Sequence, residues 1–286
     1  MADDKACDSA PAIPHISHPA PAAHSHAHTT TSASVFLAEL EASLVDGGTG
    51  RTTREVVCKV VGAVPVNLKA LRLEASLYRD KLEKLQGIHV AEFLGLFEGS
   101  AAGDKPYAIL VTVFEGDTLN RELVEYDVDF RRRVLDALIA IHKAGTTHGD
   151  VVQHNIVRKD NGTPMFIDFD CGETPHECGY REGSIKFHAP MPMAGDVGCV
   201  ELWMVTHEAD VWTSSHYSYY SGQEEPGKIP VEEVLLGREN IIKYQLARGV
   251  NPKFVEDNAD AVISALGDCI QRRTLFDGEV PLHQAP

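Results

Sequence analysis

The sequence predicts an α+β protein in which a strand-rich first part is followed by a mainly helical remainder. Three observations carry this prediction. Strand-like runs rich in Val, Leu and Phe succeed one another between residues 35 and 113, with one helical stripe among them. A short hairpin pattern surrounds Asn161-Gly162 in the middle of the chain. Two amphipathic stretches, 231–246 and 254–270, then follow.

Composition limits the possible functions. With 286 residues, of which 43% are hydrophobic, the chain can bury one large core or two lobes. Its 42 acidic and 26 basic residues give a net charge of −16, which argues against nucleic-acid binding. The sequence contains neither an apolar run long enough to span a membrane nor a signal peptide at its N-terminus. We therefore expect an intracellular protein, cytoplasmic or nuclear, with no membrane partner.

Residues 1–32 consist largely of Ala, Pro, Ser, Thr and His, and they contain few large apolar side chains. Such a segment cannot offset the entropy of ordering by burial, so a disordered tail is expected. The pattern His24-x-His26-x-His28 could bind a divalent metal, although a solvated tail is the favoured interpretation.

The six cysteines are too scattered for a secreted disulfide framework. A zinc site is one alternative for four metal-binding side chains, namely Cys171, His176, Cys178 and Cys199. Their spacing fits no common zinc module, which favours ordinary half-buried thiols.

The first part of the chain contains one charge in an unexpected place. Strands are predicted at 35–40 and 55–61, and Lys59 interrupts the apolar run of the second, so its ammonium group must reach solvent or a partner. A helix is predicted next, from an apolar stripe that ends before Gly87 and comprises Leu71, Ala75, Tyr78, Leu82 and Leu85. Glu74 borders this stripe and is therefore aimed toward the core.

Two further strands are predicted at 90–98 and 107–113. A helix at 129–143 then leads directly into the central polar stretch, because an Asp opens it and Gly145 follows its basic end. A loop is expected at 214–227.

The central stretch runs from Thr147 to Asp170 and carries the clearest chemistry. Asp150 could accept a proton, Asn155 lies five residues on, and Asp168 follows the hairpin. A base with two oxygen-bearing side chains is what phosphoryl transfer from a metal-bound nucleotide requires. The alternative interpretation is an ordinary β-hairpin with one acidic residue before its first strand and another after its second.

In this order, His148, Gly149, Asp150, Asn155 and Asp168 resemble the protein-kinase-like superfamily. More narrowly, they resemble its His-Gly-Asp branch, including uncharacterised kinase-like proteins of fungi. The resemblance covers about residues 33–215. It implies a two-lobed fold that binds ATP and Mg²⁺ between the lobes: a small β-rich N-lobe with its hinge at 33–116, and a shortened helical C-lobe at 117–286.

The resemblance also implies residue roles. Asp150 would deprotonate the acceptor, and Asn155 and Asp168 would bind Mg²⁺. Lys59, held by Glu74, would orient the phosphates; an exposed Glu74 with a local basic partner is the alternative. Two residues would bind adenine through their backbones, the Thr112 carbonyl and the Phe114 amide.

The resemblance extends to Asp210-Val211-Trp212, which resembles the start of a central helix whose Asp braces the catalytic loop. A surface helix with a buried Trp is the alternative.

Two departures from the family pattern keep two functions open. Gly48-Thr49-Gly50 stands only nine residues before Lys59 and is interpreted as a turn, so the first hairpin would fall near residues 28–34, which contain no Gly. In addition, Ala189-Pro190-Met191 lacks the acid that completes the substrate-loop signature of protein kinases. A separate difference, Asp170 where protein kinases have Gly, favours a small-molecule acceptor. The first hypothesis is an ATP- and Mg²⁺-dependent phosphotransferase acting on a hydroxyl of a protein or a small molecule. The alternative is a weak or inactive pseudokinase that serves as a binding or scaffold protein.

Overall fold

The computed structural model describes residues 33–43, 51–62, 64–101, 105–214, 216–219, 227–265, 267 and 271–272. The expected tail, its His pattern, the turn at 46–50 and most of the expected first hairpin lie outside these residues. The chain divides into two compact units. The first comprises Met1–Asn120 and Ala140–His176, and the second comprises Arg121–Ile139 and Glu177–Pro286. This division differs from the linear boundary expected at residue 116, because the central polar stretch joins the N-terminal sheet.

The first unit is built on a four-stranded antiparallel sheet in the order β1-β2-β4-β3. Its strands are β1 (Ala33–Ser43), β2 (Arg51–Gly62), β3 (Phe93–Ala101) and β4 (Lys105–Val113). The α+β class with strands first and helices later is thus confirmed. The third strand begins at Phe93 rather than at Val90, because Val90 lies in isolated bridges to Gln86 and Phe166.

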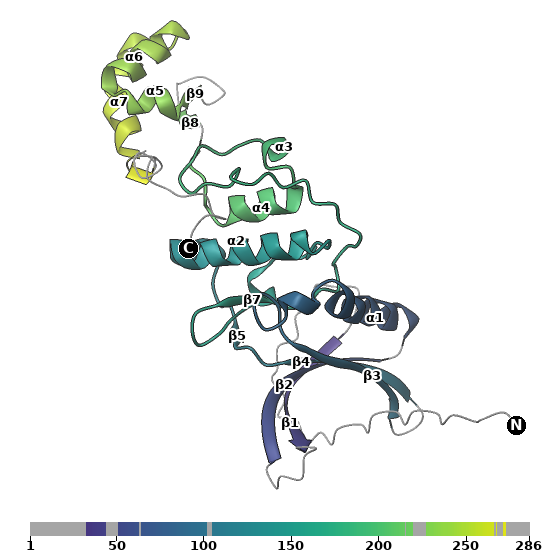
Figure 1. The fold of residues 1–286 in the computed structure, drawn as a ribbon. Coiled ribbons are helices and arrows are strands. Elements are labelled where there is room, and N and C mark those ends of the chain that lie inside the picture. Colours follow the sequence, from purple (N-terminus) through teal and green to yellow (C-terminus); the bar gives the residue numbers. More distant parts are fainter. Residues whose placement is uncertain are drawn as a thin grey trace, which may run out of the picture. The chain divides into compact units, whose positions relative to one another are not determined.

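Helix α1 (Pro65–Asp80) covers one face of this sheet (Figure 1). It begins with a proline, whose missing N–H costs nothing in the first turn of a helix. The prediction that the helix continues to Gly87 is wrong, since it ends at Asp80 and a short 3-10 helix, η1 (Glu83–Leu85), follows. Leu71 and Ala75 of α1 lie in one buried cluster with Val61, Ala108 and Leu110 of the sheet.

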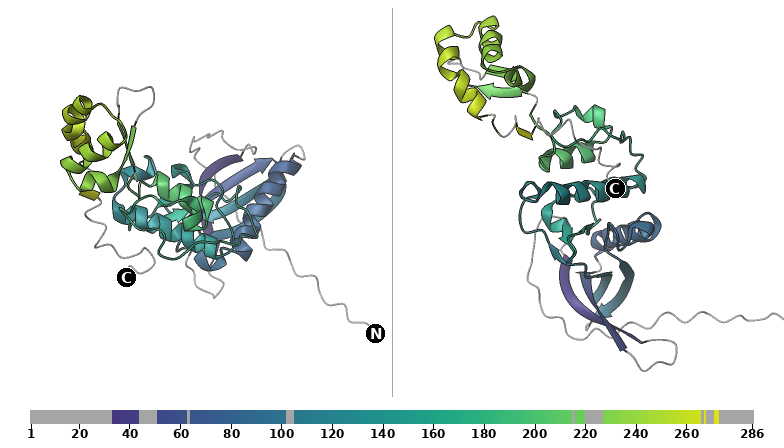
Figure 2. Two further views of the ribbon diagram at one scale, coloured as in Figure 1. Left: turned by 90° about the horizontal axis from the view of Figure 1, so that it is seen from above. Right: turned by 60° about the vertical axis from the view of Figure 1, so that its left-hand side comes forward.

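The opposite face of the sheet has a separate apolar cluster, Ala38, Val56, Cys58 and Val111. A cavity of about 130 Å³ opens on this side. Both views of Figure 2 show the sheet curving, with α1 on one side. Because side chains alternate along a strand, Lys59 faces the other way from Cys58, toward α1.

The predicted central hairpin is confirmed. It pairs β6 (Ile156–Arg158) with β7 (Pro164–Phe166), and β5 (Asp117–Thr118) adds a third strand. Phe166 donates its N–H to the carbonyl oxygen of His89 at 2.8 Å, and its own carbonyl accepts from the N–H of Ala91 at 3.3 Å. These bonds fix the chain just before Asp168 against the segment that leads into β3.

The second unit is mainly helical. Helix α2 (Val128–Lys143), as predicted, contributes all but its last turn, after the 3-10 helix η2 (Leu123–Glu125). There follow α3 (Ala194–Val197), α4 (Val200–Glu208), the hairpin β8 (His216–Tyr219) with β9 (Gly227–Pro230), α5 (Val231–Leu235), α6 (Arg238–Ala247) and α7 (Pro252–Ala265). The loop expected at 214–227 therefore contains paired strands among its described residues.

The last three helices share one apolar core, which includes Ile229, Val234, Ile241, Val255, Ala259 and Val262. The helix expected at 231–246 is broken in two, because Gly237 adopts a φ of 96°, a left-handed conformation that ends a helix. The chain closes this core with α7, which begins at Pro252 and ends at Ala265.

The expectation that Asp210 begins a helix is wrong. Asp210 follows the end of α4 with a φ of 48°, and the residues from Val211 to Ser214 are not helical. Its carboxylate instead accepts a hydrogen bond from Arg272 at 2.7 Å. The alternative, a surface helix with a buried Trp, fails in the same place, although Trp212 is buried.

Within the described ranges, no helix combines the length and the apolar character that crossing a membrane requires.

Candidate active site

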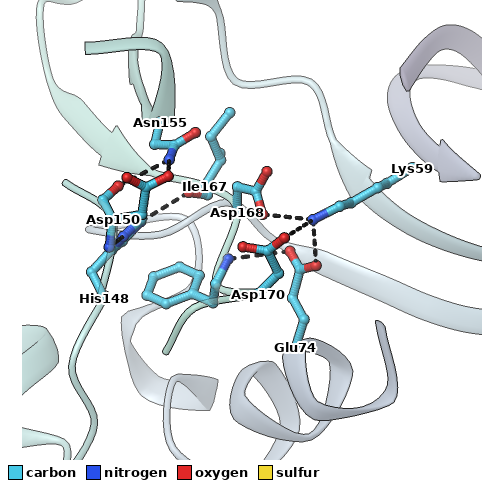
Figure 3. A network of polar contacts seen from close by, with 9 residues as sticks. Lys59, Glu74, His148, Asp150, Asn155, Ile167, Asp168 and Asp170 are labelled. Atoms are coloured by element: carbon cyan, nitrogen blue, oxygen red, sulfur yellow. Dashed lines mark hydrogen bonds and ion pairs between the residues drawn. The ribbon is translucent and has the colours of Figure 1, made fainter. Parts of the chain in front are cut away.

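Lys59 is the centre of an ion network in the first unit (Figure 3). Its Nζ lies 2.9 Å from Glu74 Oε2 and 2.6 Å from Asp168 Oδ1. Asp170 Oδ2 lies 3.8 Å from the same nitrogen. Glu74, the partner that the resemblance implies for Lys59, is thus one of the residues it contacts, and both side chains are buried.

The charges of this network compete for one ammonium group. Burial alone would lower the pKa of Lys59, but the carboxylates of Glu74, Asp168 and Asp170 outweigh it and raise that pKa, so Lys59 stays charged. Burial raises the pKa of Glu74 to about 7; Lys59 opposes this rise and Asp168 adds to it. Against the effect of burial, the charge of Lys59 and its hydrogen bond hold the pKa of Asp168 below its ordinary value.

Asp168 is held in an uncommon backbone conformation, with a φ of 64°. Such a conformation costs on the order of 1 kcal/mol or more and persists where the surrounding structure imposes it. Here it directs the Asp168 carboxylate toward Lys59, while the Phe169 N–H donates to Glu74 Oε1 at 3.3 Å. The hairpin and helix α1 thus jointly fix this residue.

His148 joins the two segments that carry Asp150 and Asp168. The side chain of His148 is fully buried, and its Nε2 lies 2.9 Å from the carbonyl oxygen of Ile167. The N–H of Asp150 donates to Nδ1 of the same ring at 3.3 Å. Nδ1 is therefore the acceptor, which assigns the proton to Nε2 and makes it the donor to Ile167.

Gly149 has a packing reason to be glycine. Its φ is 82°, and a Cβ at this position would lie 2.1 Å from the carbonyl oxygen of Cys171. No side chain fits there without moving the backbone, and an arginine is excluded along with the rest. The close approach of the Cys171 carbonyl explains this glycine, and the sequence alone does not reveal it.

Asn155 orients Asp150. It ends the 3-10 helix η3 (Gln153–Asn155), and its Nδ2 donates to the Asp150 carbonyl at 2.9 Å and to Asp150 Oδ2 at 3.1 Å. The Asn155 carbonyl accepts from the N–H of Ile167 at 3.0 Å. Among the residues that the structure describes, none hydrogen-bonds Asn155 Oδ1, which is an oxygen of the kind that Mg²⁺ prefers.

A row of rings supports the site from the side of α1. Tyr78 stacks on Phe93 at 5.4 Å between ring centroids and meets Phe169 edge-on at 5.5 Å. Phe169 in turn lies 4.7 Å from the ring of His148. This row connects α1, β3 and the two segments that carry Asp150 and Asp168. Sequence reasoning placed Tyr78 on an apolar stripe but missed the row, for which the only signal is an aromatic residue between two aspartates.

The two residues predicted to contact adenine, Thr112 and Phe114, have different surroundings in the structure. Thr112 is buried within β4, opposite Val57 of β2. The amide of Phe114 already donates to the carbonyl oxygen of Glu55 at 3.0 Å. An adenine that used this amide would first have to displace the bond to Glu55.

Sequence reasoning missed an apolar wall beside Lys59. Val35 and Leu37 of β1 are 47% and 37% exposed, and they pair directly with Lys59 and Val57 of β2. Directly paired residues of neighbouring strands share one face of the sheet. An exposed apolar surface therefore lies beside Lys59 on the same face of the sheet, and only the strand register could reveal it.

Two members of the zinc alternative, Cys171 and His176, lie in the first unit, and they do not belong to one group of potential metal ligands. Cys171 is largely exposed, yet partial burial of its thiol and the adjacent carboxylate of Asp170 raise its pKa to about 11. His176 instead contacts His142, with 3.1 Å between ring nitrogens. Cys171 therefore takes no part in a metal site with His176, whereas two imidazoles, those of His176 and His142, lie close enough to share one metal ion.

No protein-family model matches the chain, and a search of curated proteins finds no significant match. Its function is therefore inferred from the residues that converge on Lys59 and Asp150.

Proposed function

We propose that this chain is a protein-kinase-like phosphotransferase that moves the γ-phosphoryl group of ATP to a hydroxyl acceptor with the help of Mg²⁺. The sheet with α1 would form the small lobe of a two-lobed fold, and the later helices the large lobe. One observation carries the proposal: Lys59 contacts both Glu74 and Asp168, which come from distant parts of the chain. A phosphate-orienting lysine beside a metal-binding aspartate is what phosphoryl transfer requires.

Each residue then has a defined task. Lys59 binds phosphate oxygens, and Glu74 holds it in place. Asp168 and Asn155 supply oxygen ligands suited to Mg²⁺, which neutralises phosphate charge when bound. Asp150, oriented by Asn155, accepts the proton of the acceptor hydroxyl. The acceptor oxygen forms a bond to the γ-phosphorus while the bond from that phosphorus to the bridging oxygen breaks, and ADP leaves.

Ligand-dependent thermal stability tests the nucleotide site. A ligand that binds only the native state at about 100 times its Kd adds about 2.7 kcal/mol, enough to raise Tm by several degrees. We expect ATP with Mg²⁺ to raise the Tm of the wild type, and of Asp160→Asn, which removes an exposed carboxylate from the hairpin turn. Asp168→Asn should lose the metal-dependent part of this rise. Equal rises in all three proteins would overturn the proposal.

Transfer itself is tested with γ-labelled ATP and two acceptor sets, a panel of Ser/Thr peptides and a panel of small alcohols and sugars. We expect label on one set, lost in Asp150→Ala while nucleotide binding remains. Label transfer that survives in Asp150→Ala would show that another group acts as the base.

A second function, a nucleotide-independent binding protein with the same fold, is favoured by one observation. The Phe114 amide that would hold adenine is bonded to Glu55. This function predicts a folded protein whose Tm does not respond to ATP, ADP or GTP with Mg²⁺. The thermal experiment therefore separates the two functions directly.

A further inference from the structure

Asp170 is the group near Lys59 to which the proposed reaction assigns no task. Its Oδ2 lies 3.8 Å from Lys59 Nζ, and its side chain is only 8% exposed. In Figure 3 its carboxylate approaches Lys59 together with those of Glu74 and Asp168. Asp170 therefore belongs to the ion network itself and not to the protein surface.

The network carries an excess of negative charge. Three carboxyl groups surround one ammonium group, which leaves one uncompensated negative charge when Glu74 is protonated and two when it is ionised. A nucleotide brings several more to the same nitrogen. Since like charges repel strongly where water is excluded, phosphate can replace a carboxylate at Lys59 only if a cation enters as well.

We propose that Asp170 is a positioning residue that makes nucleotide binding depend on a divalent cation. In the metal-free protein it holds Lys59 jointly with Asp168 and keeps bare polyphosphate out. Asp168 would hold Mg²⁺, whose charge would offset that of Asp170, so that Lys59 would be able to contact the phosphates. This inference rests on the proposed function, because it concerns the same site.

The test is the ratio of the ATP Kd in EDTA to the ATP Kd in Mg²⁺, measured by calorimetry or by dye competition. For the wild type and the control Asp160→Asn we expect a large ratio. In Asp170→Asn, which keeps the shape and removes the charge, bare ATP should bind about 10-fold tighter while the Kd of Mg²⁺-ATP changes less than about 3-fold. Asp170→Glu, which restores the charge, should restore the ratio.

A purely structural role for Asp170 would weaken both Kd values and leave their ratio unchanged. A ratio in Asp170→Asn within about 2-fold of the wild type overturns the inference. That outcome leaves the proposed function intact, since the wild type still binds Mg²⁺-ATP. A wild type that binds no nucleotide under either condition overturns both. Should Asp170→Asn fail to fold, Asp170→Ser makes the same comparison with a smaller side chain.

Discussion

The ammonium group of Lys59 lies 2.6 Å from Oδ1 of Asp168, although 109 residues separate them in the sequence. The same nitrogen contacts Glu74, which is buried. Burying charges costs free energy that only good pairing offsets. Removing one partner leaves the other charges buried without compensation. The stability of the first unit should therefore depend on this network.

Replacing Lys59 by Met should leave the buried carboxyl group of Glu74 without its cationic partner and destabilise the protein by about 3 kcal/mol at neutral pH. Adding Glu74→Gln should recover part of this loss, because the most deeply buried of the three carboxylates is then gone while Asp168 and Asp170 remain. The measurement is urea unfolding of the wild type, both single variants and the double variant. Additive losses in the double variant would mean that the two side chains do not interact in solution.

The raised pKa of Glu74 predicts how stability depends on pH. Its pKa is about 7 in the folded protein, against an ordinary value of 4.5. Between these values the folded state holds a proton that the unfolded state has lost, so this carboxyl makes stability fall as pH rises through that window. The fall should be on the order of 1 to 3 kcal/mol in metal-free protein. Unfolding free energies measured across the window should show it.

The control for this prediction is Glu83→Gln, which removes an exposed carboxylate and should keep the slope of unfolding free energy against pH. Glu74→Gln should flatten that slope. An unchanged slope in Glu74→Gln would assign the pH dependence to other groups.

Gly149→Ala should be severely destabilising or prevent folding, because its Cβ would meet the Cys171 carbonyl in a left-handed backbone conformation. Gly195→Ala is the matched control, since Gly195 lies in α3 and has open space around its Cβ position. Expression, Tm and near-UV circular dichroism of the two variants give the comparison. A stable Gly149→Ala protein would show that the loop can move away from Cys171.

The parts of the site that the sequence predicts are those encoded by short spacing. Asp150 and Asn155 lie five residues apart and bond each other, and the Asn-Gly turn of the intervening hairpin brings Asp168 back. Glu74 was found because helical periodicity aims it at the core. Local patterns thus identify the residues, whereas the pairing of Lys59 with Glu74 follows from the resemblance and is present in the structure.

What the sequence misses depends on register or on the backbone. The exposed wall of Val35 and Leu37 follows from how β1 pairs with β2, and a sequence leaves register open. The bond from the Phe114 amide to Glu55 leaves no trace in side-chain identity. Asp210 resembled a helix start, yet its positive φ and its bond to Arg272 place it beyond the end of a helix.

Asn155→Ala should lower phosphoryl transfer by about 100-fold or more while lowering stability by only about 1–3 kcal/mol. The variant loses both bonds that orient Asp150 and also an oxygen suited to Mg²⁺. Comparing label transfer with Tm separates the two effects. Asn155→Asp keeps the oxygen ligand but places a second carboxylate beside Asp150, so it should retain metal binding and still lose activity. Full activity in Asn155→Ala would contradict the role assigned to this residue.

The apolar wall beside Lys59 predicts which part of a nucleotide it recognises. If Val35 and Leu37 contact the base, replacing both by Ser should weaken ATP binding by about 10-fold, as expected from the loss of a few buried methyl and methylene groups. Binding of inorganic tripolyphosphate with Mg²⁺ should not change, because it reaches Lys59 and Asp168 but has no base. Val66→Ser, on an exposed position of α1, is the matched control. Equal weakening of both ligands would instead indicate that the substitutions disturb β2 and Lys59, and that the base binds elsewhere.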